Sequence, residues 1–507
     1  MTKILNAVNA LVWGAPALVL ILGVGLYLSL RTGFAQITLF PKALRAFLSR
    51  LKGRKGSEDG VSPFQALCTA LAATVGTGNL VGVAGAIALG GPGAIFWMWI
   101  CAILGMATKF AEATLAVRYR TPDGKGGPMY MIRDGLGKPF SWLAGLYSFF
   151  GIVAAFGVGN ATQINALVGG LNQAIAAFGG RETKAGNLLM GICLSILVAA
   201  MLLGGARRIG EAAERLVPFA SAAYLLLCLG VLILNAGRIP GAFLAIVRGA
   251  FSPRAVTGGI LGSVFQSLRV GVSRGVFTNE AGMGTASIAH ATAQVKHPAD
   301  QGLMGIMEVF LDTIVICTMT ALVILCSGVV IPYGTDPGVE LTSRAFSAVY
   351  GDWVSVLLAL FLGCFAFATV LGWGLYGARC AQFLFGDNAW QKFALLQAAA
   401  VILGAVSGTG TVWILSEIVN GLMAIPNLIA LVALSPELIR LTRDYRKHFG
   451  RRTANGGTNE HIHQCQPLRT VSYAEIPPPG GGSGAEGQNH LSSEHRSARP
   501  EDSPGLL

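Results

Sequence analysis

The chain has 507 residues, of which 53% are hydrophobic and only 12% are charged, whereas about 25% of the residues of an ordinary soluble protein are charged. This composition excludes a soluble globular protein and indicates a membrane protein that crosses the bilayer several times. The net charge of +12 is spread over separate loops, so we expect no nucleic-acid partner. The nine cysteines lack metal-ligand spacing and are interpreted as small buried apolar residues.

Eleven apolar stretches are long enough to cross a bilayer as helices, which takes about 20 residues each. The sequence therefore predicts an all-α polytopic membrane protein with 11 transmembrane helices, embedded in a lipid bilayer. Their approximate ranges are 9–30, 63–89, 92–117, 140–172, 186–204, 213–236, 257–290, 303–328, 352–384, 390–408 and 411–435.

Lys and Arg are concentrated in alternate loops, which is the pattern of loops on the cytoplasmic side. The basic segments are 31–55, 118–138, 207–215 and 440–452, and most loops between them are poor in charge. The loop 237–256 is the exception, because it carries arginines on the side predicted to be external. The pattern predicts a multi-pass protein of the plasma (cell inner) membrane, with the N-terminus outside and the C-terminus in the cytoplasm.

These loops divide the chain into five parts. Residues 1–62 form an extra helix and a basic cytoplasmic loop, 63–236 and 257–435 form two halves of five helices, and 237–256 form an external loop. Within that loop "GAFLAIVRGAF" (241–251) is too short to span and predicts a re-entrant or interfacial helix. The tail 436–507 is first basic and then rich in Gly, Pro and Ser, which predicts disorder. Its "HIH" (461–463) and Cys465 have no second cluster, so we do not interpret them as a metal site.

Two of the predicted spans are interrupted by glycine and polar residues. The second contains "GTGN" (76–79), and the seventh is interrupted within "SLRVGVSRGVFTNEAGMGTAS" (267–287). Transporters built from inverted repeats place broken helices at corresponding positions in their two halves. If the first span is an extra helix, the two interrupted spans open the two five-helix halves. The alternative is that glycines only allow close helix packing, and we prefer it for Gly82 and Gly85.

An unwound helix can bind both ends of an amino acid and its coupling ion. Its free N–H groups lie at a positive dipole end and suit a carboxylate, whereas its free carbonyl groups suit a dehydrated cation such as Na⁺. A zwitterionic amino acid beside a sodium ion matches both. The threonine and asparagine in "GTGN" add polarity that close packing alone does not require.

Two stretches also resemble a known family. The segments "TALAATVGTGNLVGVAGAIALGGPGAIFWMWICAILG" (69–105) and "RGVFTNEAGMGTASIAHA" (274–291) are similar to those of the alanine-or-glycine:cation symporters, also called sodium:alanine symporters. The resemblance extends from about residue 9 to residue 450. It implies a leucine-transporter-type 5+5 inverted repeat preceded by one extra N-terminal helix. It also implies Na⁺-coupled symport of a small neutral amino acid, alanine and/or glycine, into the cell by alternating access, and we expect the protein to function as a monomer.

The resemblance also implies a binding site. It places the substrate against the unwound segment, with a glutamine that matches Gln163 and with a second unwound segment that matches Val270 and Gly271. Gln266 and Arg269 depart from the family pattern there. The implied substrate-binding residues are Gly76, Thr77, Gly78, Asn79, Gln163, Val270, Gly271, Thr369 and Trp373. The implied Na⁺ ligands are mostly backbone carbonyls, from Ala72, Val75, Phe365 and Ala368, together with the hydroxyl of Thr369.

Ionisable residues inside spans need an explanation, since each costs about 2.5 to 3.5 kcal/mol at the bilayer centre on insertion scales. Lys109 and Glu112 are three residues apart and are interpreted as a structural pair. Arg274 and Glu280 are interpreted as part of an inner gate network, and a structural ion pair with Glu112 is the alternative. The role of Arg269 is left open.

Proton coupling on the same fold is the main alternative function. It needs a titratable residue near the break of the second span, and no Asp, Glu, His or Lys occurs between Asp59 and Lys109. Glu112 and Glu280 could still act from other spans. An intramembrane enzyme would need a paired nucleophile and base, which the spans lack, and His290 stands alone in the sequence. A channel is not excluded, although two broken helices favour a transporter.

Overall fold

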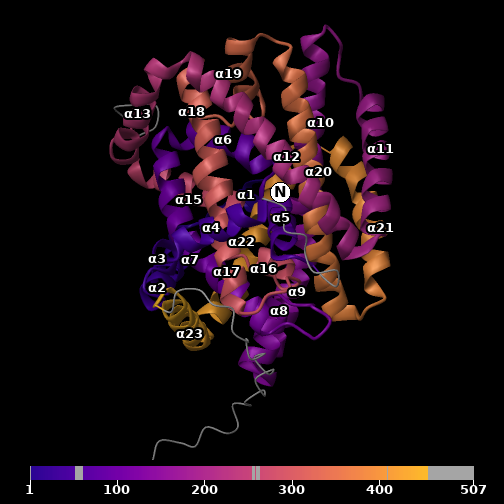
Figure 1. Ribbon diagram of the computed structural model, residues 1–507. Helices are drawn as coiled ribbons and strands as arrows, with labels where there is room; N and C mark the ends of the chain where they lie inside the picture. Colours follow the sequence, from indigo (N-terminus) through magenta and orange to yellow (C-terminus); the bar gives the residue numbers. More distant parts are fainter. Residues whose placement is uncertain (1, 52–60, 254–256, 258–262, 408, 455–507) are drawn as a thin grey trace, which may run out of the picture. The chain divides into compact units, whose positions relative to one another are not determined.

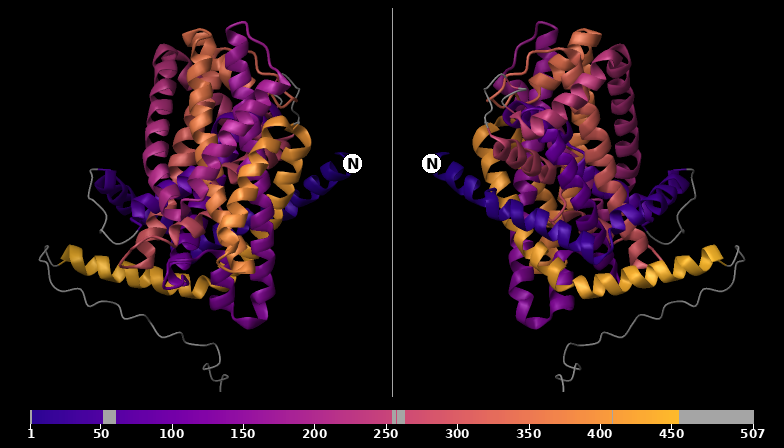
Figure 2. Two further views of the ribbon diagram at one scale, coloured as in Figure 1. Left: turned by 90° about the vertical axis from the view of Figure 1, so that its right-hand side faces the viewer. Right: turned by 90° about the vertical axis from the view of Figure 1, so that its left-hand side faces the viewer.

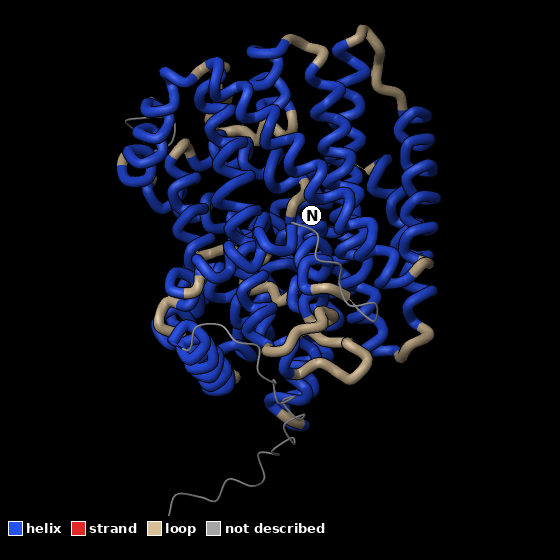
Figure 3. The backbone as a smooth tube through the Cα atoms, viewed as in Figure 1, coloured by secondary structure: helices blue, strands red, loops and turns tan. Residues whose placement is uncertain are grey.

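The structure is a computed structural model that describes residues 2–51, 61–253, 257, 263–407 and 409–454. All of these residues belong to one unit, Met1–His461. Within them the secondary structure is helical, with no strand beyond a single bridge between Val61 and Ala293 (Figure 3). The prediction of an all-α protein is therefore confirmed for the described part. The "HIH" motif and Cys465 lie outside it.

Seven helical segments of the described part are long and apolar enough to cross a membrane, and the number rises to nine if two bent pairs count as single spans. Within the described residues every predicted span contains helix, but the count of eleven is not reached by this criterion. The seven are α7 (Gly93–Arg118), Lys138–Ala177 (η3 to α10), α11 (Lys184–Leu202), α12 (Gly205–Leu234), Pro298–Ser327 (α17 to α18), α20 (Val354–Phe385) and α21 (Ala389–Val406). The bent pairs are Pro63–Thr74 with Gly78–Gly90, and Glu417–Ala433 with Ser435–Lys447.

The first predicted span differs most from the structure. Two helices, α1 (Thr2–Val12) and α2 (Ala15–Arg31), replace it, because Gly14 is extended and Pro16 then starts a new helix. The second of them has only 17 residues, which is at the lower limit for a membrane-spanning helix. The short α3 (Ala35–Thr38) and the amphipathic α4 (Phe40–Leu51) follow.

The central helices pack closely through small residues, as expected in a membrane protein. Figure 1 shows α7 among α15 (Val264–Asn279), α17 (Pro298–Val309) and α13 (Ile239–Phe251), and these pairs are in contact. A Cβ atom on Gly93 would lie 2.1 Å from the backbone of Gly249 in α13. The predicted short helix of the 237–256 loop is therefore present and packs directly on α7.

The peripheral helices α11 and α12 carry outward-facing apolar side chains. Leu189, Ile196, Leu226 and Ile233 are 63%, 64%, 69% and 65% exposed. Such a surface is unfavourable in water and suits lipid tails. Together with the long apolar helices, it supports a multi-pass membrane protein.

The last helix described, α23 (Ser435–Ala454), follows α22 (Thr409–Ala433) after a bend of 60° and runs across the long helices (Figure 2). Basic segments meet there. Arg446 donates to the Gly33 carbonyl at 3.1 Å, and Arg118 of α7 pairs with Glu437 at 2.9 Å. The structure thus brings together the described residues of three basic segments, 31–51, 118–138 and 440–452, which the charge pattern assigns to one side.

Candidate functional site

The second predicted span is broken where its glycine and polar residues occur. Helix α5 (Pro63–Thr74) ends at Thr74, and Val75 leaves the helical region with φ −77° and ψ 93°. The chain continues through the wide turn η1 (Gly78–Gly82) into α6 (Val83–Gly90), and the two parts are bent by 54°. The break that the sequence predicts in this span is confirmed.

Side chains bind the backbone N–H groups of this break. Gly76 N–H donates to Asn79 Oδ1 at 2.9 Å, and Thr77 N–H donates to Gln163 Oε1 at 3.2 Å. In a continuous helix the Gly76 N–H would bond the carbonyl of Ala72. The break therefore deprives that carbonyl of its helical donor and turns two N–H groups toward side-chain acceptors.

Helix α20 closes tightly over the break. A Cβ atom on Gly76 would lie 2.6 Å from Thr369 Oγ1 and 3.1 Å from Gln163 Oε1. The Thr369 hydroxyl donates to the carbonyl of Phe365 at 2.9 Å, which leaves its lone pairs available as acceptors. The predicted residues Gly76, Gln163 and Thr369 thus lie together, although they come from α5–η1, α10 (Thr162–Ala177) and α20.

The predicted sodium ligands lie on two helices in direct contact. A Cβ atom on Gly372 of α20 would touch the backbone nitrogen of Ala73 in α5 at 2.9 Å. The five residues supply oxygen atoms only, four carbonyls and one hydroxyl, which is the ligand type that hard cations prefer. They are all at most 2% exposed: Ala72, Val75, Phe365, Ala368 and Thr369.

The hydroxyl of Thr77 is the unexplained polar atom of the break. Thr77 is fully buried, and its Oγ1 has no hydrogen-bond partner among the described residues. Such a group costs about 1 to 3 kcal/mol if it stays unpaired. A polar ligand at the break would satisfy it.

Trp373 lies one turn beyond Thr369 on the same helix, as the sequence predicts. Its indole Nε1 donates to Glu280 Oε1 at 2.8 Å, and its ring packs where a side chain on Gly159 would otherwise stand. The second carboxylate oxygen of Glu280 accepts from the Thr285 hydroxyl at 2.5 Å. Trp373 is therefore fixed by the second broken helix.

The seventh predicted span is also broken, at its "NEAGMG" segment. Helix α15 ends at Asn279, Glu280 has φ 54°, and α16 (Thr285–His290) begins after Gly284, whose φ is 78°. The break thus lies inside the predicted stretch 267–287, toward its C-terminal end. Thr278, next to it, faces the first break, because a Cβ on Gly78 would lie 3.2 Å from its Oγ1.

Val270 and Gly271 are not brought to the first break. They lie within the regular helix α15, where Val270 contacts Gly90 and Gly271 abuts the Ala94 carbonyl. The resemblance aligned the unwound segment of this span several residues too early, since the left-handed positions are Glu280, Gly282 and Gly284.

The ionisable residues pair differently from the sequence-based prediction. Lys109 Nζ lies 2.8 Å from Glu308 Oε1, not next to Glu112, and both side chains are fully buried. Arg274 pairs with Glu417 at 3.2 Å and with Asp336 at 3.5 Å, so the proposed network with Glu280 is wrong.

Two further buried residues have partners that the sequence did not suggest. His290 Nε2 lies 2.9 Å from Glu308 Oε2, so this histidine does not stand alone. Glu112 Oε1 accepts from the N–H groups of Gly282 and Gly284 at 3.0 and 3.1 Å and from Asn427 Nδ2 at 2.7 Å. Glu112 thus caps the second break rather than forming an ion pair.

Asp312 is the residue that sequence reasoning missed. It lies in the wide helical segment η6 (Phe310–Cys317), is fully buried, and accepts from Asn79 Nδ2 at 2.7 Å. The titratable group at the first break belongs to another span, since Asp312 lies in the predicted span 303–328 and not in the span that contains Asn79. A carboxylate inside the apolar run 303–328 was the signal that could have revealed it.

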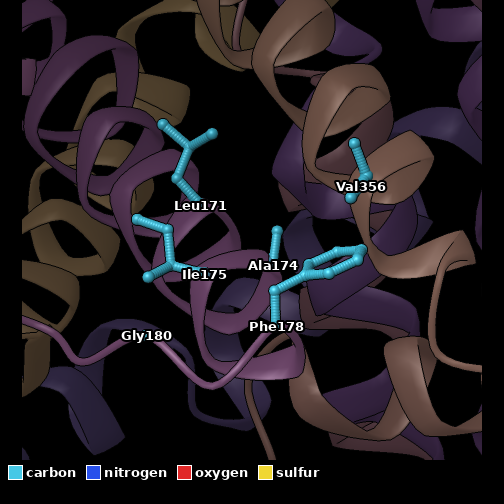
Figure 4. Close-up of a pocket in the computed structure, with 6 residues that line it drawn as sticks. All are labelled: Leu171, Ala174, Ile175, Phe178, Gly180 and Val356. Atoms are coloured by element: carbon cyan, nitrogen blue, oxygen red, sulfur yellow. The ribbon is translucent and has the colours of Figure 1, made fainter.

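Two surface hollows complete the description. The larger, of about 440 Å³, is lined by Leu171, Ala174 and Ile175 of α10, by Phe178 and Gly180 after it and by Val356 of α20 (Figure 4). None of these residues has a polar side chain to bind a zwitterion. The smaller, of about 150 Å³, is lined by both polar and apolar side chains. Its lining residues are Asn9, Trp13, Leu89, Arg269, Val270, Ser273, Arg274 and Glu417.

Comparison with a solved structure identifies the fold type. MhsT, solved in complex with L-phenylalanine, superposes with a TM-score of 0.53 over 76% of this chain and 99% of MhsT. The sequence identity is 15%, so the likeness shows the fold alone. It supports a transporter fold of the leucine-transporter type. The division into two inverted five-helix repeats stays a prediction.

Comparison with known sequences also indicates a transporter. The sodium/alanine symporter AgcS of Methanococcus maripaludis is 43% identical over 456 residues, which cover 88% of this chain and 97% of AgcS. The amino-acid carrier protein AlsT of Bacillus subtilis is 37% identical over 450 residues, 88% of this chain and 92% of AlsT. Residues 1–458 match the sodium:alanine symporter family as a whole. The chain therefore belongs to the sodium:alanine symporter family, whose members are membrane transporters of amino acids.

Proposed function

We propose that this protein carries alanine or glycine into the cell together with Na⁺ by alternating access. The break at Gly76 and Thr77 is the observation that carries the proposal. Two N–H groups there donate to amide oxygens, and a substrate carboxylate would be a stronger acceptor at the same positions. The unpaired Thr77 hydroxyl adds a third donor.

The close packing of the site supports a small substrate. Even one added Cβ on Gly76 would collide with Thr369 and Gln163. In the proposed site the carboxylate of the substrate is held by Gly76, Thr77, Gly78 and Asn79. The side chains of Gln163 and Thr369 face the ammonium group of the substrate. Trp373, held in place by its hydrogen bond to Glu280, limits the size of the side chain of the substrate. Val270 and Gly271 belong to the approach to the site rather than to the site, because Val270 lines the smaller hollow.

Sodium would be held by the carbonyls of Ala72, Val75, Phe365 and Ala368 and by the Thr369 hydroxyl. The Ala72 carbonyl lacks its helical donor, which favours this role. One ion that crosses 100 mV releases about 2.3 kcal/mol, and a tenfold gradient adds about 1.4 kcal/mol. One Na⁺ per amino acid thus suffices for accumulation on the order of several hundredfold.

The orientation follows from the basic segments. They are gathered around Gly33, Arg118 and α23, and we assign that side to the cytoplasm of a cell with this protein in its plasma membrane. The N-terminus is then outside. Uptake runs from the side of α13 and α19 (Glu340–Tyr350) toward the side of α23.

Reconstituted vesicles test the proposal directly. Labelled alanine and glycine uptake is measured under an inward Na⁺ gradient, with K⁺ gradients and pH gradients as controls. We expect concentrative uptake with the Na⁺ gradient and little with K⁺. Uptake that is indifferent to Na⁺ would remove the coupling claim, and a dominant effect of the pH gradient would favour the proton-coupled alternative.

A further inference from the structure

The N-terminal helix α1 holds an acidic residue of α22 in place. Asn9 Nδ2 donates to Glu417 Oε2 at 2.8 Å, and Trp13 Nε1 donates to the backbone carbonyl of Glu417 at 2.9 Å. These bonds join residues that are 408 and 404 positions apart in the sequence. A Cβ atom on Gly421, one turn after Glu417, would collide with Val12, so α1 lies directly on α22. Helix α1 therefore fixes both the backbone and the carboxylate of Glu417.

The other carboxylate oxygen of Glu417 pairs with the second broken span. Arg274 Nη1 of α15 lies 3.2 Å from Glu417 Oε1. The two side chains are only 14% and 17% exposed, and a desolvated ion pair is stable only if further hydrogen bonds satisfy its remaining lone pairs. Asn9 supplies such a bond to Oε2. The ion pair between α15 and α22 thus depends on α1.

This ion pair stands between the smaller hollow and the first break. Ser273, Arg274 and Glu417 line the hollow. One turn farther along α15 the Thr278 hydroxyl donates to the Arg274 carbonyl at 2.6 Å, and it faces Gly78 of the first break. Thr278 is 1% exposed. The hollow therefore ends at the ion pair, and the break behind it is closed off.

The break at Gly14 allows α1 and α2 to have different partners. Helix α2 packs on α7, where a Cβ atom on Gly25 would lie 3.0 Å from Leu104 Cβ. Helix α1 packs on α22 at the side of the bundle (Figure 2), and its Ile4 and Leu11 are 69% and 73% exposed. Since the extended Gly14 separates the two helices, α1 can follow a movement of α22 while α2 stays on α7.

We propose that Asn9 and Trp13 of the N-terminal helix are positioning residues for transport. They hold Glu417 against Arg274 and so keep the approach to the first break closed. The proposal rests on the proposed function. When α22 moves outward, α1 moves with it and Arg274 keeps an acidic partner, because its Nη2 also lies 3.5 Å from Asp336. Loss of the bonds from α1 frees Glu417, and the approach then opens more often.

Cysteine labelling of the purified full-length carrier in detergent tests the proposal. Thr278→Cys reports on the closed side of the ion pair and Ser273→Cys on the hollow, both in a Cys193→Ala background that removes the exposed cysteine of the described part. A polar methanethiosulfonate reagent is the probe. We expect Asn9→Leu to accelerate labelling at Thr278→Cys several-fold and to leave labelling at Ser273→Cys unchanged. Asn9→Asp sets a second carboxylate against Glu417, so we expect a larger acceleration.

Asn235→Leu is the matched control. The Asn235 amide donates to the Val231 carbonyl of its own helix at 3.0 Å and touches neither member of the ion pair. We expect labelling at Thr278→Cys to keep its wild-type rate in this variant. A merely structural role of Asn9 would lower the melting temperature without changing the ratio of the two labelling rates. An unchanged ratio in both Asn9 variants would overturn the proposal.

A second pair of variants covers the case in which the Asn9 variants do not fold. Trp13→Phe keeps a ring and removes the donor to the Glu417 carbonyl, whereas Trp142→Phe changes a side chain that is 67% exposed. We expect faster labelling at Thr278→Cys in the first variant only, and equal rates in both would also overturn the proposal. If the wild-type carrier shows no uptake under any gradient, the proposed function fails, whereas the labelling rates still decide whether α1 keeps the approach closed.

Discussion

At the scale of single residues, Gly76 is the position where the packing leaves least freedom. The variant Gly76→Ala places a methyl group 2.6 Å from the Thr369 hydroxyl, and such overpacking typically costs about 1 to 3 kcal/mol. We expect alanine uptake to fall at least about tenfold, which corresponds to about 1.4 kcal/mol at the site. The measurement is initial uptake per folded carrier in vesicles.

Gly82 offers a matched control for this variant. It belongs to the same broken span, has helical dihedral angles, and an added Cβ would meet nothing within 4 Å, so the close packing predicted at Gly82 is not found. Gly82→Ala should therefore transport like the wild type. Equal losses in Gly76→Ala and Gly82→Ala would show that any extra methyl group in this span is harmful, and would contradict a site at Gly76.

Trp373 is expected to act on stability through its N–H group. The variant Trp373→Phe keeps a ring but leaves Glu280 Oε1 without its donor, in a fully buried place. An unpaired buried acceptor costs about 1 to 3 kcal/mol. We expect a lower melting temperature of the purified carrier, whereas Trp142→Phe, at a side chain that is 67% exposed, should leave it unchanged. An unaltered melting temperature in Trp373→Phe would contradict this assignment.

At the scale of elements, the second break depends on a cap from a different helix. Glu112 of α7 accepts both N–H groups of the break, from Gly282 and Gly284, on one oxygen. Glu112→Gln retains a carbonyl oxygen that can accept them. Glu112→Ala leaves two buried N–H groups unpaired, at about 1 to 3 kcal/mol each.

Thermal unfolding of the two purified variants separates the cap from a charge effect. We expect Glu112→Gln to melt close to the wild type and Glu112→Ala to melt far lower. Two variants that lose the same stability would mean that the negative charge, and not the acceptor geometry, holds the break. Alanine binding should follow the same order, because α15 and α16 are positioned by this cap.

The positions of the helices could be predicted from the sequence. The breaks within helices, and the residues that contact those breaks, could be predicted only in part. Apolar stretches of sufficient length located helices at every predicted span, since in lipid the backbone must be satisfied within the helix. "GTGN" located the first break, because glycine and polar residues are costly there. The break at Gly14 was missed, because apolar residues continue on both sides of it; Pro16, which suits the first turn of a new helix, was the signal that could have revealed it.

The partners of the site depend on distance in space, which the sequence does not contain. Gln163 and Thr369 were placed by resemblance, and the structure brings both to Gly76. Asp312 was missed because 233 positions separate it from Asn79. The resemblance also placed an unwound segment at Val270 and Gly271, where the structure has regular helix, because similarity of sequence does not say which of several glycines in "VGVSRGVFTNEAGMG" adopts a left-handed conformation.

At the scale of the whole molecule, the proposed orientation in the membrane rests on the basic side of the protein, and cysteine labelling in intact cells tests it. Single cysteines are introduced in a Cys193→Ala background, because Cys193 is the exposed cysteine of the described part. The two positions are Arg181, which is exposed before α11, and Asp123, whose side chain is 57% exposed in the loop after α7. The proposed topology places the first outside and the second in the cytoplasm. A membrane-impermeant maleimide should therefore label Arg181→Cys in intact cells and Asp123→Cys only after permeabilisation. The reverse pattern would show that the protein has the opposite orientation in the membrane, and it would overturn the assignment of the α13 and α19 side as external.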